Sequence, residues 1–283
     1  MSATSPRIEP LAFSRTASLA VSIIVAVKRV DAALLDLLRG LREARFPLPY
    51  EVILVAATND HGTLSEIRNQ FPLVLVYTAS AYLEQGALYD IGVKAAGGKH
   101  LLLLDSTAHP TAATLTEMVR FADNGQFIGA VVPRYVTASG ADRPACRFFP
   151  RPITACLEAI GFSPTYPKLN YAFNRLVTTP KEVDAAEAGC VLIRRAAILD
   201  VGGLSTGYPA GGEIWDWCMR ARLKGWTVFL QPGNQAIVTS PDLPYANTDK
   251  RAAVRRFIYR FYGWVPSALL AIIMLPCEVK DRW

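Results

Sequence analysis

The sequence has little charge and no continuous apolar segment at its start. Charged residues make up 19% of the 283 residues and hydrophobic residues 51%, a balance that excludes an intrinsically disordered chain. Residues 1–20 mix prolines and charges with short apolar pieces, so they lack the apolar core of a secretory signal. We therefore expect a folded, cytoplasmic protein that begins with a loose arm over residues 1–20.

Cysteine pairs and histidine clusters are also missing. The five cysteines are odd in number and form no C-x-x-C pair, which argues against a disulfide framework and a zinc site and favours reduced, buried thiols. His61, His100 and His109 have no metal-ligand spacing, so each is expected at the surface or in a turn.

The sequence does have a regular alternation of strand and helix patterns. β-branched and leucine-rich runs predict strands at residues 21–27, 51–56, 73–78 and 99–104. Between them, apolar residues at helical spacing predict helices at 32–45, 63–70 and 84–96, and the glycine pair after the last one predicts its C-terminal stop. This order predicts an α/β fold with a mostly parallel central sheet.

An acidic residue follows the most apolar of these strands. The run at 99–104 is almost pure leucine, so we expect it at the centre of the sheet, and its carboxyl end leads into Asp105. Ligands of open α/β sheets bind outside the carboxyl ends of the strands. The sequence therefore predicts a binding site near Asp105, although an acid at a strand end is also a common turn residue.

Several short segments come in a characteristic order. They are Val21-Ser-Ile-Ile-Val25, Glu51-Val-Ile-Leu-Val55, residues 92–97 before Leu101-Leu-Leu-Leu-Asp105, residues 188–195 before Val201-Gly-Gly203, Gly212-Glu213 with Asp216-Trp-Cys-Met-Arg220, and Lys224-Gly-Trp226. This ordered set resembles the family-2 glycosyltransferases, particularly the rhamnosyltransferase-like members. The resemblance implies a GT-A type nucleotide-binding domain over residues 21–245.

The resemblance also implies where a nucleotide-sugar donor binds. The matching positions are Val25, Ala26, Ala56, Asp90, Asp105, Ser106 and Thr107. The family usually has a base-contacting aspartate where this chain has Ala56, so that contact is lost or moved. Its D-x-D loop reads Asp105, Ser106 and Thr107 here, which leaves Asp105 as the carboxylate that holds a divalent cation, Mg²⁺ or Mn²⁺. Arg194 and Arg195, at a later strand end, face either the donor diphosphate or solvent.

An acidic helix carries the expected catalytic residues. The family's usual Glu-Asp pair reads Glu213-Ile214 here, so the aspartate that would deprotonate the acceptor is absent. Transfer with inversion needs a carboxylate near the attacking hydroxyl, because an alcohol is a poor nucleophile until its proton leaves. Glu213 and Asp216 share a helix face and are the catalytic candidates, with Glu213 preferred; the alternative is a solvated acidic face.

Residues 137–182 are rich in proline and aromatic residues and have little periodicity. We expect an irregular insert, which the resemblance places on the acceptor side.

The C-terminal segment, residues 246–283, combines basic and apolar residues. Five basic residues, from Lys250 to Arg260, precede an apolar run from Gly263 to Leu275 that is interrupted by Pro266 and is shorter than the about 20 residues of a spanning helix. This pattern predicts that residues 250–276 lie on an anionic membrane surface, peripherally and on the cytoplasmic face. The alternatives are packing on the core and an oligomer contact.

These features favour an inverting transferase that moves a sugar from a nucleotide-sugar to a glycan or lipid-linked acceptor in cell-surface polysaccharide synthesis. The alternative is a catalytically silent relative that serves as a nucleotide-sugar binder, partner subunit or membrane scaffold. A sugar-nucleotide modifying enzyme of another class is disfavoured, because the chain has no G-x-G-x-x-G fingerprint and no evident nucleophile. We expect no nucleic-acid partner.

Overall fold

The fold comes from a computed structural model that describes residues 19–44, 46–58, 60–157, 177–209, 211–239 and 247–280. Most of the predicted N-terminal arm and residues 158–176 of the predicted insert lie outside this description.

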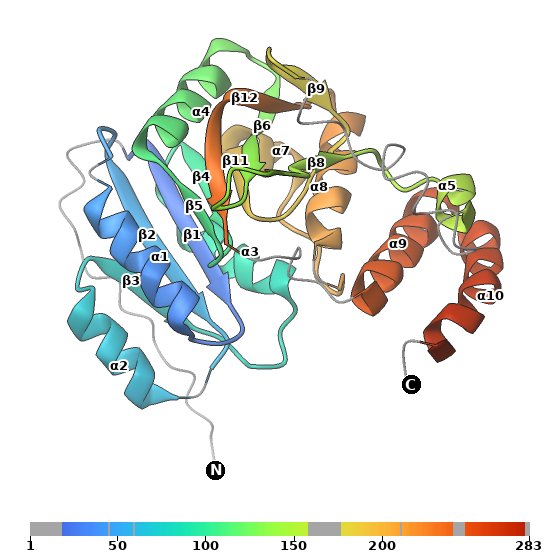
Figure 1. Cartoon of the computed structure of the whole chain (residues 1–283), viewed down its shortest axis with the longest axis horizontal. Coiled ribbons are helices and arrows are strands. Elements are labelled where there is room, and N and C mark those ends of the chain that lie inside the picture. Colours follow the sequence, from blue (N-terminus) through green and yellow to red (C-terminus); the bar gives the residue numbers. More distant parts are fainter. Residues whose placement is uncertain are drawn as a thin grey trace.

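A ten-stranded sheet forms the centre of the described structure, in the order β3-β2-β1-β4-β11-β6-β12-β5, with β7 beside β6 and β9 beside β12 (Figure 1). The strands are β1 (Val21–Val27), β2 (Tyr50–Ala56), β3 (Val74–Thr78), β4 (His100–Leu104), β5 (Ala108–Pro110), β6 (Ile128–Val136), β7 (Asp142–Arg143), β9 (Lys181–Val183), β11 (Cys190–Arg194) and β12 (Thr227–Val238). β1 to β4 pair in parallel, as do β6 and β12, whereas β11 runs antiparallel between β4 and β6.

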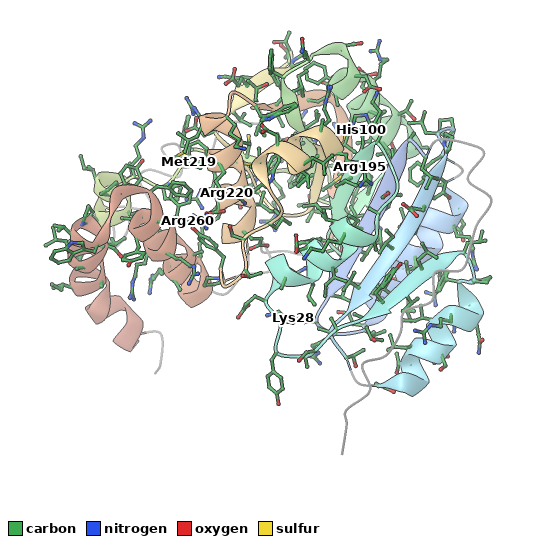
Figure 2. All side chains as sticks on the ribbon, turned by 180° about the vertical axis from the view of Figure 1, so that it is seen from behind. Lys28, His100, Arg195, Met219, Arg220 and Arg260 are labelled. Atoms are coloured by element: carbon green, nitrogen blue, oxygen red, sulfur yellow. The ribbon has the colours of Figure 1, made fainter. Side chains whose placement is uncertain are left out.

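Helices cover both faces of this sheet, which confirms the predicted α/β class (Figures 1 and 2). They are α1 (Ala32–Glu43), α2 (His61–Gln70), α3 (Gln85–Ala95), α4 (Ala112–Asn124), α5 (Pro152–Leu157), α7 (Arg195–Val201), α8 (Gly212–Leu223), α9 (Asn247–Tyr262) and α10 (Trp264–Lys280). A separate two-stranded sheet pairs β8 (Cys146–Arg147) with β10 (Ala185–Ala186).

The four strands predicted from apolar patterns are all present, and their ends move by at most one residue. β1 and β4 are buried along their whole length because each is covered on both faces, as continuous apolar runs predict. β3 lies at the edge of the sheet, and most of it is only half-buried.

The glycines after α3 serve a different purpose from the predicted helix stop. Neither Gly97 nor Gly98 has a positive φ, and α3 already ends at Ala95. A Cβ on Gly98 would lie 2.6 Å from the main-chain nitrogen of Ser22. Gly98 is therefore required by the close approach of the chain to β1, which fixes how β4 enters the sheet.

The C-terminal segment folds into two helices joined at Gly263, whose φ of 91° suits glycine. The predicted interruption at Pro266 is wrong, because this proline lies in the first turn of α10, where its missing N–H costs no hydrogen bond. α9 packs on the domain through a buried face that includes Phe257 and Ile258. No helix in the described ranges is long and apolar enough to cross a membrane.

Replacing Gly98 by alanine should destabilise the fold, because the backbone of β1 cannot move aside as a flexible side chain would. We expect the free energy of unfolding to fall by about 1–3 kcal/mol, measured by urea denaturation. Gly40 is the matched control: it lies within α1 with nothing within 4 Å of an added Cβ. Gly40→Ala should raise stability by about 0.5–1 kcal/mol. Equal effects at the two positions would contradict the close approach.

Candidate active site

The acidic loop after β4 has a fixed conformation. Asp105 donates its backbone N–H to the carbonyl of Gly189 at 2.7 Å, which ties the loop to the start of β11. Its Oδ1 accepts the backbone N–H of Thr107 at 2.9 Å and the Thr107 hydroxyl at 2.7 Å. Ser106 is half-buried between them. The other oxygen, Oδ2, has no hydrogen-bond partner among the described residues, so one carboxylate oxygen remains for a ligand.

The residues on β1 and β2 that were predicted to contact the donor have buried side chains. The side chains of Val25, Ala26 and Ala56 are at most 3% exposed. The carbonyl of Ala26 accepts the Gln85 amide at 2.8 Å, and that of Ala56 accepts the Ala79 N–H at 3.0 Å. A donor would therefore meet residues that follow these strands, not these side chains.

Lys28 is a residue that follows one of these strands, and it was not among the predicted site residues. It follows β1 directly, is about half exposed, and pairs with Glu84 at 3.2 Å. The signal was available, because the residue that follows a parallel strand lies at the binding edge. Asp90, on α3, lies further along that helix, pairs with Lys94 at 2.7 Å and sits against Gly203.

Glu213 lies in the first turn of α8 with no solvent exposure. Neither carboxylate oxygen has a hydrogen-bond partner at good geometry within the described chain. Burial raises its pKa from 4.5 to about 7, and the nearby amides of Gly211 and Glu213 offset this only in part. The negative charge of Glu84 raises this pKa further, while Lys28 lowers it. Glu213 is therefore a buried acid poised near neutral pH.

Tyr89 of α3 is buried near Glu213 and the acidic loop. Its ring is 2% exposed. Burial raises the pKa of Tyr89 well above its ordinary value, and the charges of Asp105 and Glu213 add to this effect. The charges of Asp105 and Glu213 thus both act on one buried tyrosine.

Asp216 is also buried, but its carboxylate is fully engaged. Its Oδ1 accepts the Tyr208 hydroxyl at 3.2 Å and pairs with Arg260 Nε at 3.0 Å. Its Oδ2 pairs with Arg220 Nε at 2.8 Å and accepts the Ser205 hydroxyl. Two guanidinium groups therefore contact this carboxylate, one at each oxygen. These contacts favour Glu213 over Asp216 as a proton acceptor.

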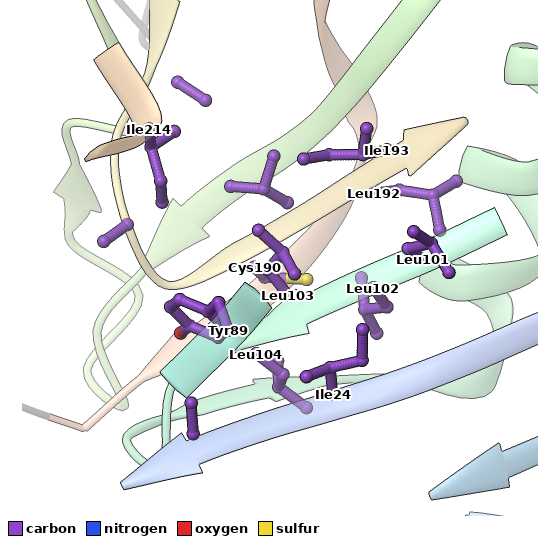
Figure 3. Packing of buried hydrophobic residues seen from close by; sticks show 14 of the residues in the cluster. Ile24, Tyr89, Leu101, Leu102, Leu103, Leu104, Cys190, Leu192, Ile193 and Ile214 are labelled. Carbon is purple, nitrogen blue, oxygen red and sulfur yellow. The ribbon is translucent and has the colours of Figure 1, made fainter. Parts of the chain in front are cut away.

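Ile214, at the position of the family's usual aspartate, belongs to the apolar core. It is 1% exposed and lies with Tyr89, Cys190 and Leu104 in the cluster shown in Figure 3. An aspartate introduced here would meet apolar side chains, because the surroundings of this position are built for isoleucine.

Three basic residues differ from expectation. His100 and Arg195 lie at the opposite edge of the sheet from Lys28 (Figure 2), and Arg194 pairs with His100 in the register of β11 and β4. His100 was expected in a turn or at the surface; this is wrong, because it is the first residue of β4, is fully buried, and contacts Asp123 through Nε2 at 3.0 Å. Arg194 and Arg195 face neither a diphosphate site nor open solvent. Arg195 donates to the carbonyls of Gly98 and Ala96, and Arg194 to that of Gly125.

A divalent cation fits this site only with help from a substrate. Among the described residues no group of three His, Cys, Asp or Glu side chains lies close enough to hold a metal ion. Mg²⁺ is commonly bound by one or two carboxylates together with substrate phosphates. Asp105 supplies one carboxylate oxygen that has no partner among the described residues. A cation there would therefore also need ligands from the diphosphate of a donor.

A mostly parallel sheet with an acidic loop at the carboxyl ends of its central strands is the architecture of a nucleotide-binding α/β protein. Residues 22–201, well over half of the chain, match the family described as Glycosyl transferase family 2. The chain belongs to this family. The match ends before α8, so Glu213 and Asp216 lie beyond it.

A crystal structure of GalNAc-T7 with UDP, GalNAc and Mn2+ is similar to this chain, with a TM-score of 0.63 and 17% sequence identity. The similarity covers 89% of this chain and 50% of that chain, so the present chain spans half of the solved one. It shows the fold, which is of the GT-A type. No curated protein sequence matches this chain.

Burial of Glu213 should make stability depend on pH. The unfolded chain releases this proton near pH 4.5 and the folded protein near pH 7. Between these values the folded state holds a proton that the unfolded state has lost, so the contribution of Glu213 is fully present below pH 4.5 and is lost as pH rises through 7. The free energy of unfolding of the wild type, relative to Glu213→Gln, should therefore decrease across this window.

Urea denaturation at a series of pH values measures this difference. Glu43→Gln, on the exposed face of α1, controls for the loss of a surface carboxylate. A difference between wild type and Glu213→Gln that does not change with pH would show that Glu213 is hydrated.

Proposed function

We propose that this protein transfers a glycosyl group from a nucleotide-sugar to an acceptor hydroxyl, with inversion, and that Glu213 is the general base. The observation that carries the proposal is that Glu213 is a fully buried carboxylate whose oxygens have no hydrogen-bond partner at good geometry in the described structure, and whose charge, like that of Asp105, acts on Tyr89. A structural acid would be paired, as Asp216 is.

In this reaction the acceptor hydroxyl gives its proton to a Glu213 carboxylate oxygen as its own oxygen attacks the anomeric carbon. The bond from that carbon to the diphosphate oxygen breaks, and its electron pair leaves with the diphosphate. A base with a pKa of about 7 is ionised in a useful fraction of molecules at neutral pH and still accepts a proton readily. Burial also keeps water from competing with the acceptor.

The donor would bind at the carboxyl edge of β1, β2 and β4, with Lys28 and the Asp105 loop against its diphosphate. A divalent cation bound with that diphosphate would stabilise the charge that develops on the leaving group. The GalNAc-T7 structure, which has a similar fold, contains UDP and Mn2+, and this supports a nucleotide-sugar donor and a divalent cation. Thr107 orients the Asp105 carboxylate and so fixes which oxygen faces the donor.

A silent relative that binds nucleotide-sugars without turnover is the second candidate. Ile214 favours it, because this position has an apolar side chain packed in the core. The two candidates share donor binding and differ only in turnover, so one pair of variants separates them.

Asp105→Ala and Glu213→Gln should affect different steps. The donor is chosen from UDP-, dTDP- and GDP-sugars by thermal stabilisation with and without Mn²⁺ or Mg²⁺, and turnover is followed as nucleoside diphosphate release. Asp105→Ala should weaken donor affinity and abolish the response to metal. Glu213→Gln should keep donor affinity and lower kcat by about 10²- to 10⁴-fold. Donor binding without turnover in the wild type would favour the silent relative, and an active Glu213→Gln variant would place the base elsewhere.

We also propose that the C-terminal helices rest on the cytoplasmic face of an anionic membrane, which would suit a lipid-linked acceptor of cell-surface polysaccharide synthesis. Apolar and aromatic side chains at least 41% exposed gather on the two helices: Tyr259, Tyr262, Trp264, Val265, Leu269 and Ile272. Val265, Leu269 and Ile272 follow the spacing of one helical face. Aromatic residues at the rim of an apolar face are typical of helices that lie in a membrane interface.

The basic residues contribute less to this surface than the sequence predicted. Arg260 pairs with Asp216, and Cζ of Arg256 lies 5.2 Å from the ring centroid of Tyr208. The net charge of +6 still favours anionic lipid over neutral lipid.

Replacing Val265, Leu269 and Ile272 together by serine should abolish co-sedimentation with vesicles of phosphatidylserine and phosphatidylcholine, because burial of these side chains supplies the binding energy. Leu199 and Leu223 are equally exposed on α7 and α8, so Leu199→Ser with Leu223→Ser is the matched control. Point substitutions are preferable to truncation of the chain after Asp249, because truncation would also remove the ion pair between Arg260 and Asp216. A wild type that stays in the supernatant, or a dimer that the triple variant dissociates, would contradict the membrane proposal.

A further inference from the structure

The buried Asp216 carboxylate joins three separate parts of the chain. Arg220 belongs to α8 itself, Ser205 and Tyr208 belong to the loop between α7 and α8, and Arg260 comes from α9. Arg260 also donates from Nη1 to the Ser205 hydroxyl at 3.1 Å. α9 thereby holds both the helix and the loop that precedes it. Figure 2 labels Arg220 and Arg260 where α8 meets the C-terminal helices.

The loop that α9 holds is anchored to α8 at further points. Arg220 donates to the carbonyls of Val201 and Gly203 at 2.9 and 2.8 Å. Trp217 donates its indole N–H to the carbonyl of Gly202 at 3.1 Å. Residues 201–208 and α8 therefore form one unit, in which the side chains of α8 fix the path of the loop.

This unit meets α3 at the first turn of α8, beside Glu213. A Cβ added to Gly86 would lie 2.4 Å from the carbonyl oxygen of Ser205 and 3.0 Å from Cβ of Glu213. The main chain of Ser205 and the stem of Glu213 thus pack against the same point of α3. A shift of Ser205 would change the position of Glu213.

We infer that Arg260 and Asp216 are positioning residues for Glu213, so that α9 completes the catalytic site of the domain. A carboxylate withdrawn from water needs both of its cationic partners, because losing one leaves a buried charge incompletely compensated. Charge-assisted hydrogen bonds also have strict geometry, so Arg260 sets where the loop and α8 lie relative to α3. This inference rests on the proposed role of Glu213 as the base.

Arg260→Gln should lower kcat for nucleoside diphosphate release by about 10- to 100-fold, because small misplacements of a catalytic group have effects of this size. The KM for the nucleotide-sugar should stay unchanged, since the donor edge of β1 and β4 is not touched. Arg260→Lys keeps the charge and should restore part of kcat. Arg68→Gln, at an exposed position of α2, changes the net charge equally and should leave kcat unchanged.

Two further measurements distinguish positioning from a general loss of stability. The double variant Arg260→Gln with Asp216→Asn should lose no more kcat than the more damaging single variant, because both act through one interaction. The pH dependence of stability attributable to Glu213, measured as wild type against Glu213→Gln, should shrink in the Arg260→Gln background as water reaches the carboxylate.

The second measurement needs no turnover. If the wild type binds donor without turnover, the proposed function fails, while the pH readout still tests whether Arg260 holds Glu213. Equal kcat losses in Arg260→Gln and Arg68→Gln, or an unchanged pH dependence in the Arg260→Gln background, would overturn the inference.

Discussion

The chemistry of this site depends on two carboxylates of α8 that lie one helical turn apart and are both withdrawn from water. Burying a carboxylate is costly unless it is paired or takes up a proton. Asp216 is paired, because Arg220 contacts one of its carboxylate oxygens and Arg260 the other. Glu213 instead takes up a proton more readily than an ordinary glutamate: its pKa is raised to about 7, and its oxygens have no partner at good geometry in the described chain. The same helix therefore carries one acid that is paired at both oxygens and one whose oxygens have no partner at good geometry in the described chain.

Parts of this arrangement were predictable from sequence because they depend on local patterns. β1 and β4 are continuous apolar runs, and only a buried parallel strand accommodates such runs at this length. Asp105 could be placed because the carboxyl end of a central strand is where ligands of α/β sheets bind. The order of the motifs located α8 and its acids before any contact was known.

Other parts depend on contacts between distant segments, which no local pattern reports. β6 was not among the predicted strands, and the antiparallel insertion of β11 between β4 and β6 is a matter of topology, not of periodicity. Only the fold brings Tyr89 within reach of the charges of both Asp105 and Glu213. The position of Arg195 after a strand allowed contact with the donor diphosphate. Because β11 runs antiparallel to β4, however, the carboxyl end of β11 lies at the edge of the sheet opposite the Asp105 loop.

The basic segment before α10 illustrates how one pattern can serve two purposes. In sequence, its arginines and aromatic residues form a single amphipathic stretch, and a charge cluster beside apolar residues is typical of membrane surfaces. In the structure the stretch divides by face. Arg256 and Arg260 point to Tyr208 and Asp216, while Tyr259 points outward. The charge of an arginine paired with a buried carboxylate is partly compensated, so attraction to a membrane would come mainly from the apolar face of α10. The inward face makes α9 part of the domain whether or not a membrane is present.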